Sequence, residues 1–504
     1  MGFNSFTFIL LFLPVLVAGW HILNRIHKYT VADGFLTLMS LYFYYTFGAS
    51  FLAILIVSIC VNYLISFIMT KVKDNSLKAL KVIGVLFNLG LLFYFKYLGF
   101  FVDNINAVSG AGISVKEILM PVGISFYTFG QISFIIDRAK GEAEHYPFLT
   151  YVMYTVYFPK LIQGPIAFHK EMIDQFNNRE LRQLNSDTFA KGLMSFIIGL
   201  SKKVILADTL ARVANYGFEQ AYYLDTLTVI VVMLAYTFQI YLDFSGYCDM
   251  ANGVSLMLGI ELPINFNSPY KASSAKELWQ RWHMTLSRFF IKYVYIPLGG
   301  SRKGKRRTVI NVLIVFVLSG LWHGAGWTYI CWGLMQGLLV VWDDLGIVGV
   351  DDGSSKKKKY LLREKPFFTV PRAVGNALTF FMFVVSLVFF RSQDLAHAFG
   401  MFKRAFFWTY PGFLTRTAGQ LEISENYVFR QVFTRLGIGS ADTVFLLTMV
   451  IYILISAFVM TRKNTGEIIK ESRYDIKTVA FYTILFVLSF ISLSNVSTFI
   501  YFKF

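Results

Sequence analysis

Charged side chains are scarce in this chain. Asp, Glu, Lys and Arg together make up 15% of its 504 residues. Soluble domains carry about 25% charged residues, so the composition excludes an ordinary soluble globular protein. Hydrophobic residues account for 56% of the chain, and the mean hydropathy is +0.55. Both values are typical of a multi-pass protein that lies within the lipid bilayer.

Several chemical signatures are also missing. The three cysteines, Cys60, Cys248 and Cys331, show neither disulfide spacing nor metal-ligand spacing. The sequence contains no Walker loop, no GxSxG elbow, no paired zinc-type ligands and no dinucleotide fingerprint. We therefore expect no metal and no bound cofactor.

Positive charge is present in excess, with a formal net charge of +17. The basic residues gather in short loops between apolar runs, as the positive-inside rule expects of cytoplasmic loops. This placement argues against nucleic acid as a partner. It assigns to the cytoplasm the basic clusters at 71–81, 302–307, 356–365 and 462–473.

Long apolar segments then predict a polytopic all-α membrane protein with about 11–12 transmembrane helices, judged against about 20 residues per crossing. The first segment, 6–23, has no convincing cleavage site, so we expect a retained span with the N-terminus outside. The remaining segments are 35–48, 50–69, 82–102, 119–136, 187–206, 226–244, 308–342, 373–391, 443–461 and 478–497. Two interrupted stretches, 154–168 and 293–300, carry Pro and Gly and are predicted to be re-entrant or interfacial.

The segment 308–342 lies between two basic clusters, so it must cross the membrane an even number of times. Its 35 residues extend only about 52 Å as a helix, whereas two crossings need about 60 Å. The apex "SGLWHGAGW" at 319–327 is therefore expected at membrane depth, with Trp322 and His323 in it. An ionisable group there is functional by default. The alternative is a neutral imidazole bonded to backbone.

A second histidine, His283, lies in "KELWQRWHMTLSRFFIKY" (276–293), where the apolar spacing predicts one amphipathic helix at the cytoplasmic interface. His283 shares a face with Trp279 and Ser287 on such a helix. It is either a second site histidine or an interfacial polar residue. Asp243 and Asp249, at the end of an apolar run, either line a polar passage or pack helices together.

No serine or cysteine nucleophile accompanies these histidines. A buried histidine of this kind suggests a general base that acts on a hydroxyl brought by another group. At this point the residues resemble a family, the membrane-bound O-acyltransferases, and within it the bacterial alginate O-acetyltransferase type. The resemblance rests on six ordered stretches: "MPVGISFYTFGQISFIIDR" (120–138), "FPKLIQGPI" (158–166), "YLDFSGYCDMANG" (241–253), "FNSPYKASSAKELWQRWHMTLS" (266–287), "YIPLGGSRKG" (295–304) and "LSGLWHGAGWTYICWG" (318–333).

The resemblance implies a ring of helices, with re-entrant and interfacial segments, around a central tunnel. The tunnel would join a cytoplasmic thioester site to an extracytoplasmic funnel. The essential histidine of the family maps onto His323, and its second histidine onto His283. We expect N-terminal helices at 1–115, a catalytic core at 116–345, C-terminal helices at 346–494 and an extracytoplasmic tail at 495–504.

The tail ends in "FIYFKF" (499–504), which resembles the C-terminal acyl-transfer motif of the companion protein of the teichoic-acid D-alanyl transferase. By this resemblance Tyr501 would accept the acyl group. A phenol has a pKa of about 10 and needs a base at neutral pH, and a histidine with a pKa of about 6.5 suits that task. The alternative is an aromatic anchor at the membrane interface.

The expected function is transfer of an acetyl group from cytoplasmic acetyl-CoA, or from an acyl carrier protein, for O-acetylation of an exopolysaccharide or cell-wall glycan. The expected partners are an extracytoplasmic serine-dependent acetyltransferase and an envelope polysaccharide, at a bacterial plasma membrane with both termini outside. The alternatives are D-alanyl transfer to teichoic acid and, from another class, a transporter or channel.

Overall fold

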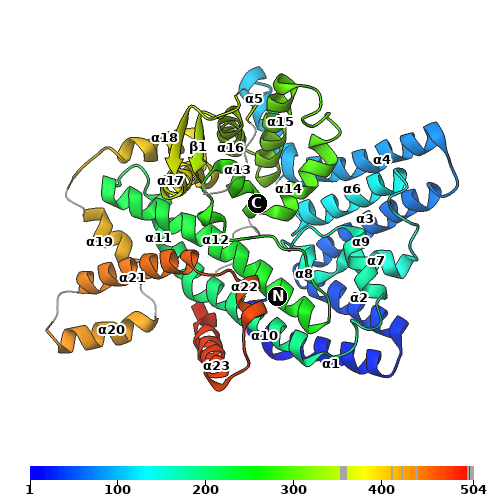
Figure 1. Cartoon of the computed structure of the whole chain (residues 1–504), viewed down its shortest axis with the longest axis horizontal. Helices are drawn as coiled ribbons and strands as arrows, with labels where there is room; N and C mark the ends of the chain where they lie inside the picture. The colour runs from blue at the N-terminus through cyan, green and yellow to red at the C-terminus, as the bar shows by residue number, and fades with distance from the viewer. Residues whose placement is uncertain are drawn as a thin grey trace. The chain divides into compact units, whose positions relative to one another are not determined.

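Figure 1 shows a computed structural model of the chain, in which helices form 74% of the structure. It describes residues 1–116, 118–351, 360–361, 363–409, 412–421, 424–437, 441–495 and 499. Tyr501, the predicted acyl acceptor, lies outside these described residues. Within them the only strands are β1 (Val348–Asp351) and β2 (Phe368–Pro371), which pair in parallel with Val348 opposite Phe368.

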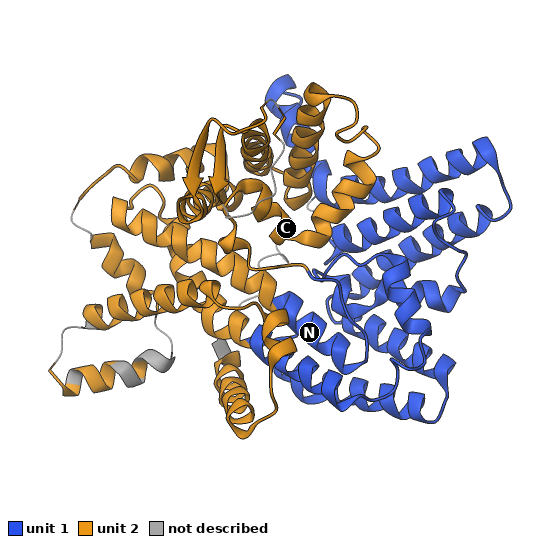
Figure 2. Ribbon diagram, viewed as in Figure 1, with its two compact units in different colours: residues 1–200, 247–264, 501–504 blue, residues 201–246, 265–500 orange. Residues whose placement is uncertain are grey.

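The chain divides into two compact units, drawn in blue and orange in Figure 2. The described part of unit 1 comprises residues 1–116, 118–200 and 247–264. Its helices are η1 (Phe8–Phe12), α1 (Leu13–Arg25), α2 (Tyr29–Tyr45), α3 (Ala49–Ile68), α4 (Asp74–Leu92), η2 (Phe93–Tyr97), α5 (Leu98–Ser109), α6 (Ile124–Ala139), α7 (Phe148–Val156), α8 (Phe158–Leu161), α9 (His169–Asn177) and α10 (Ser186–Ser201).

Unit 2 comprises residues 201–246 and the described residues of 265–500. The helix α12 (Thr226–Met257) begins in unit 2 and ends in unit 1. The other helices of unit 2 are η3 (Lys202–Ala207), α11 (Asp208–Glu219), η4 (Pro269–Lys271), α13 (Ala275–Arg281), α14 (Met284–Phe290), η5 (Ile291–Tyr295), α15 (Lys305–His323), α16 (Trp327–Leu345), α17 (Arg372–Arg391), α18 (Leu395–Arg404), α19 (Gly412–Gly419), α20 (Ser424–Arg435), α21 (Ala441–Thr461), α22 (Thr465–Glu471), α23 (Ile476–Ile491) and η6 (Ser492–Asn495).

Six helical segments of the described chain are long and apolar enough to cross a bilayer, which confirms a multi-pass all-α membrane protein. The total of 11–12 crossings stays a prediction. The six segments are Phe8–Arg25, Ala49–Ile68, Asp74–Ser109, Thr226–Met257, Arg372–Arg391 and Asp442–Thr461.

Buried amides hold the helices of unit 1 together. Asn62 of α3 and Asn88 of α4 exchange two side-chain hydrogen bonds, of 3.2 Å and 2.7 Å. Such bonds join helices where the surroundings are too apolar for water to compete. The predicted irregular stretch 154–168 also belongs to this unit, and after α8 its backbone loses helical form at 162–168 while almost all of its residues stay buried. Burial in protein is the condition under which irregular backbone is tolerated in a membrane protein.

The hairpin of α15 and α16 positions the histidine of the predicted apex. Its two helices approach closely because glycines face each other: a Cβ atom on Gly320 would lie 2.2 Å from the carbonyl oxygen of Tyr329, and one on Gly333 would lie 2.3 Å from that of Phe316. Neither position has room for a side chain. The turn between the helices falls at 324–326, as the hairpin prediction requires.

The prediction of one continuous amphipathic helix over 276–293 is wrong. The helix breaks at Trp282 and His283, where α13 ends and α14 begins. The apolar spacing continues across the break, which is why the periodicity gave no sign of it.

Candidate active site

His323 is the last residue of α15, and its side chain is 1% exposed. Aromatic rings contact the imidazole from three helices. The ring centroid of Trp322 lies 4.9 Å away, and those of Trp332 in α16 and Phe390 in α17 each lie 5.2 Å away. Walls of this kind exclude water, which strengthens electrostatic interactions between a base and a reacting group.

His283 lies at the break between α13 and α14 with φ 43° and ψ 50°, in the left-handed region. Residues other than glycine are uncommon there, and such strain persists only where the surroundings fix the residue. The imidazole is 0% exposed, and its Nδ1 lies 3.0 Å from Oδ1 of Asn265.

The same oxygen of Asn265 fixes the tautomer of His283. It accepts hydrogen bonds from the backbone N–H of Thr285 at 3.3 Å and from the Thr285 hydroxyl at 2.8 Å. Because a backbone N–H can only donate, this atom is the amide oxygen, so His283 must donate from Nδ1. Burial lowers the pKa of His283 to about 3. The ring is therefore neutral at physiological pH, with its lone pair on Nε2.

The structure brings the two predicted histidines together within unit 2. Their ring centroids are 6.3 Å apart, and the ring of Trp322 lies 5.9 Å from that of His283. Two further predicted residues are nearby: the ring of Trp279 packs on Trp332 at 5.7 Å, and the hydroxyl of Ser287 lies 3.4 Å from the backbone oxygen of Trp279. One buried site thus holds residues from two of the predicted motifs, 266–287 and 318–333.

The two predicted aspartates take different positions along α12. Asp243 belongs to unit 2 and accepts a 2.7 Å hydrogen bond from the ammonium of Lys203. Asp249 belongs to unit 1, where its backbone oxygen accepts a hydrogen bond from Ser195. The apolar run that was expected to end near residue 244 continues as helix to Met257.

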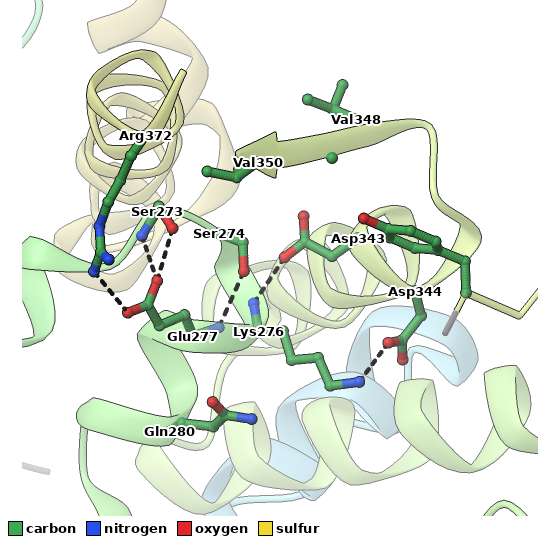
Figure 3. Close-up of a pocket in the computed structure, with 12 residues that line it drawn as sticks. Ser273, Ser274, Lys276, Glu277, Gln280, Asp343, Asp344, Val348, Val350 and Arg372 are labelled. Carbon is green, nitrogen blue, oxygen red and sulfur yellow. Dashed lines mark hydrogen bonds and ion pairs between the residues drawn. The ribbon is translucent and has the colours of Figure 1, made fainter. Parts of the chain in front are cut away.

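A polar pocket of about 460 Å³ opens between α13, the end of α16, β1 and the start of α17 (Figure 3). Ion pairs organise its walls: Lys276 contacts Asp344 at 2.6 Å, and Arg372 contacts Glu277 at 3.6 Å. Burial alone would raise the pKa of Glu277, but hydrogen bonds from Ser273 and the ion pair with Arg281 hold it below its ordinary value. Glu277 therefore stays a carboxylate and keeps both arginines in place.

An apolar pocket of about 390 Å³ shares Ser273, Ser274 and Asp343 with the polar one and extends between α13, α16 and α17. Gln336 lies on its wall and accepts a 3.1 Å hydrogen bond from the indole N–H of Trp279. One helical turn before Gln336 is Trp332, whose ring packs on His323. The two pockets and the buried histidine are thus joined by a continuous series of side-chain contacts.

Sequence reasoning missed several residues of this site. Asn265, which orients His283, lies 18 residues before it, and Phe390, which contacts His323, lies 67 residues after it. Neither carries a local signal. Among the described residues, no cluster of His, Cys, Asp or Glu side chains is suited to hold a metal ion.

A family model described as membrane-bound O-acyltransferase matches residues 115–351, and close relatives extend the match over most of the chain. The chain belongs to this family. The acyltransferase is 37% identical over 429 residues to a peptidoglycan O-acetyltransferase of Helicobacter pylori, which covers 80% of this chain and 79% of the relative.

This acyltransferase also resembles a probable alginate O-acetylase of Pseudomonas syringae, with 37% identity over 81% of this chain and 75% of the relative. A teichoic acid D-alanyltransferase of Streptococcus thermophilus is 28% identical over 55% of this chain and 69% of the relative. The matches confirm the family predicted from the six motifs and make the chain a multi-pass membrane acyltransferase. The roles of the individual site residues stay predictions.

Proposed function

We propose that this acyltransferase transfers an acetyl group from cytoplasmic acetyl-CoA to Tyr501, with His323 as the general base, for O-acetylation of an exopolysaccharide or cell-wall glycan outside a bacterial plasma membrane. The observation that carries the proposal is the buried pair of His283 and His323, 6.3 Å apart within an aromatic enclosure. The names of the most similar relatives, which act on peptidoglycan or alginate, support an acetyl group and a glycan.

The two pockets of unit 2 suit a thioester donor. Lys276 and Arg372 at the polar pocket provide cations for phosphate groups, and the predicted cytoplasmic basic cluster 356–365 follows β1 in sequence. The adjoining apolar pocket would take the uncharged arm that carries the thioester. Donor entry at this end would direct the acyl group along Gln336 and Trp279 toward His323.

The chemical step needs one base and no cofactor. His323 would accept the phenol proton of Tyr501 as the phenolate oxygen attacks the thioester carbonyl. Collapse of the tetrahedral intermediate breaks the carbon–sulfur bond, and the departing thiolate takes the proton back from His323. The products are a tyrosyl ester and free CoA. Neutral His283, held by Asn265 through Nδ1, keeps its lone pair on Nε2 and would orient one of the reacting groups.

The acetyl group would leave Tyr501 in a second transfer. A phenolate is a better leaving group than an alkoxide, so the tyrosyl ester retains enough transfer potential to acylate the serine of an extracytoplasmic acetyltransferase. That partner would then acylate the glycan. The N- and C-termini of the chain would both face outward in this arrangement.

The test uses purified protein in liposomes with radiolabelled acetyl-CoA, followed by digestion and mass spectrometry. We expect acetyl on Tyr501 in the intact chain, no adduct in Tyr501→Phe, and a loss of roughly 10²–10⁴-fold in the rate for His323→Ala. His27→Ala, which removes an exposed histidine, serves as the control. Normal transfer in His323→Ala would exclude the general-base role of His323. An active Tyr501→Phe variant would show that the acetyl group passes from the donor to its acceptor without a tyrosyl ester.

D-alanyl transfer is the second candidate, because one relative is named a teichoic acid D-alanyltransferase. This reaction requires a carrier protein loaded with D-alanine in place of acetyl-CoA. Labelling by a D-alanyl carrier protein, with no labelling by acetyl-CoA, would favour it. Membership of an acyltransferase family supports either of these over a transporter or channel.

A further inference from the structure

Unit 2 also contains a buried ionic cluster, formed by Lys203, Asp208 and Asp243. The ammonium of Lys203, in η3, donates to Oδ1 of Asp208 and to Oδ1 of Asp243, each at 2.7 Å. The Lys203 side chain is 0% exposed, and both carboxylates are buried. Burying three charged groups is costly even when they are paired, so this cluster gives weak support for stability alone.

An aromatic ring from the terminal motif covers the same ammonium. Nζ of Lys203 lies 4.5 Å from the ring centroid of Phe499, and Phe499 is 1% exposed. A desolvated cation over an aromatic face is attracted by the ring quadrupole. Phe499 is the first residue of the "FIYFKF" stretch. The cluster therefore holds the start of the segment that carries the proposed acyl acceptor.

The helix before the terminal segment is tied to the same place. Ser489 of α23 lies 2.8 Å, hydroxyl to hydroxyl, from Ser201 of α10, two residues before Lys203. Lys203 itself lies in a π-helical turn, a local widening that is frequent at functional sites. Helix α23 and Phe499 thus both contact residues 201–203.

The cluster is linked to the histidine pair by one helix. Asp243 and Phe244 are neighbours in α12, and while Asp243 bonds to Lys203, the ring of Phe244 lies 4.8 Å from that of His283. Adjacent Cα atoms are 3.8 Å apart. Two peptide units separate Phe499 from Tyr501, so in any conformation their Cα atoms lie within about 7 Å of each other.

We infer that Lys203, Asp208 and Asp243 form a seat for the ring of Phe499, and that this seat sets the register in which the terminal segment meets His283 and His323. The inference rests on the proposed function for its purpose and on the contacts of Phe499 for its geometry. The three charged residues and Phe499 are positioning residues. They bind the segment and take no part in bond making.

The binding test does not depend on acyl transfer. The photoreactive residue p-benzoylphenylalanine replaces Phe499 in the full-length chain, and the products of irradiation are digested and sequenced by mass spectrometry. We expect an intramolecular cross-link to peptides that contain residue 203 or 243. Lys203→Leu should reduce its yield several-fold, whereas Lys191→Leu, which removes a half-buried lysine that is also paired with an aspartate, should not.

The functional test measures acetylation of Tyr501 in a single turnover, together with KM for acetyl-CoA. Phe499→Leu keeps an apolar side chain and removes the ring, so we expect acetylation to slow by about 2-fold to 30-fold, as loss of a cation–π contact predicts, with KM unchanged. Phe499→Tyr should restore the rate. A general loss of folding would not lower the rate while leaving KM unchanged, and an aromatic residue at position 499 would not reverse it.

The outcomes separate the two proposals. A cross-link to 203 or 243 without acetyl on Tyr501 would support the seat and overturn the carrier role of Tyr501. Acetyl on Tyr501 at the normal rate in Phe499→Leu, with no cross-link to either peptide, would overturn the seat and leave the proposed function standing. If Lys203→Leu fails to fold, the variants of Phe499 decide the question.

Discussion

Nδ1 of His283 donates a hydrogen bond to Oδ1 of Asn265 across 3.0 Å, and the two residues are 18 positions apart in sequence. Asn265 is itself buried and accepts two further hydrogen bonds from Thr285. A single amide oxygen therefore sets both the ring orientation of His283 and the start of α14. The left-handed backbone of His283 is held by the same interaction.

Asn265→Ala should destabilise the protein by about 1–3 kcal/mol, because the N–H of His283 and the hydroxyl of Thr285 would lose a buried acceptor. The thermal midpoint of the protein in detergent measures this effect. Asn267→Ala, at an exposed position two residues later, is the matched control. Equal midpoints for the two variants would show that the Asn265 hydrogen bonds contribute nothing to stability.

Acidification should weaken the native protein partly through His283. Its pKa is about 3 when folded and about 6.5 when unfolded, so below pH 6.5 the unfolded chain binds a proton that the folded chain does not. Stability conferred by neutral His283 is full above pH 6.5 and declines toward pH 3. Between pH 7 and pH 5 the loss is about 2 kcal/mol.

His283→Asn removes this titration and keeps a residue that tolerates the left-handed region. The thermal midpoint of this variant should fall less between pH 7 and pH 5 than that of the parent chain. Parallel pH profiles for the two proteins would mean that His283 titrates normally in the folded state.

Leu339→Trp should raise KM for the acyl donor, because Leu339 lines the apolar pocket of about 390 Å³ and an indole would fill part of it. Leu338→Trp provides a control on the neighbouring residue, whose side chain is 51% exposed. Donor titrations with both variants in liposomes measure the effect. An equal KM for the two would place the donor elsewhere.

Gly333→Ala should separate α15 from α16, because the added Cβ would lie 2.3 Å from the carbonyl oxygen of Phe316. Overpacking of this kind costs about 1–3 kcal/mol, and the shift would displace His323 from Trp332. We expect a lower thermal midpoint and slower acyl transfer. The control is Gly326→Ala, where the atom nearest to the added Cβ would lie at an ordinary 3.5 Å, and this variant should behave like the parent chain. If Gly333→Ala also leaves the thermal midpoint and the transfer rate unchanged, the close packing of α15 on α16 is refuted.

Local sequence was sufficient for the helical class and for the turn beside His323. The apolar runs predicted the helical class, and the length of 308–342 predicted a turn near His323, which the structure has at 324–326. These features depend on residues close together in the chain, where hydropathy and glycine content are informative. The motif order then supplied the family.

Contacts between distant residues were not predictable in this way. The break at His283 depends on Asn265, and the partner of Asp243 is Lys203, 40 residues earlier. Apolar spacing continues through the break, because a left-handed residue changes the backbone direction without changing the composition. The sequence shows that Asp243 is polar. Whether Asp243 lines a polar passage or packs helices together depends on Lys203, a side chain from another helix, and this cannot be read from the local sequence.

The contact between Lys203 and Phe499 also has a consequence for biogenesis. The ribosome makes residue 203 before residue 499, and at 5–20 residues per second the interval is about 15–60 s. During that time the ammonium and its two aspartates can assemble in the membrane while the aromatic ring has yet to be translated. A nascent chain interrupted after residue 323 and before residue 499 would carry the histidine pair without Phe499, so the contact that positions the terminal segment would form only after the histidines are in place.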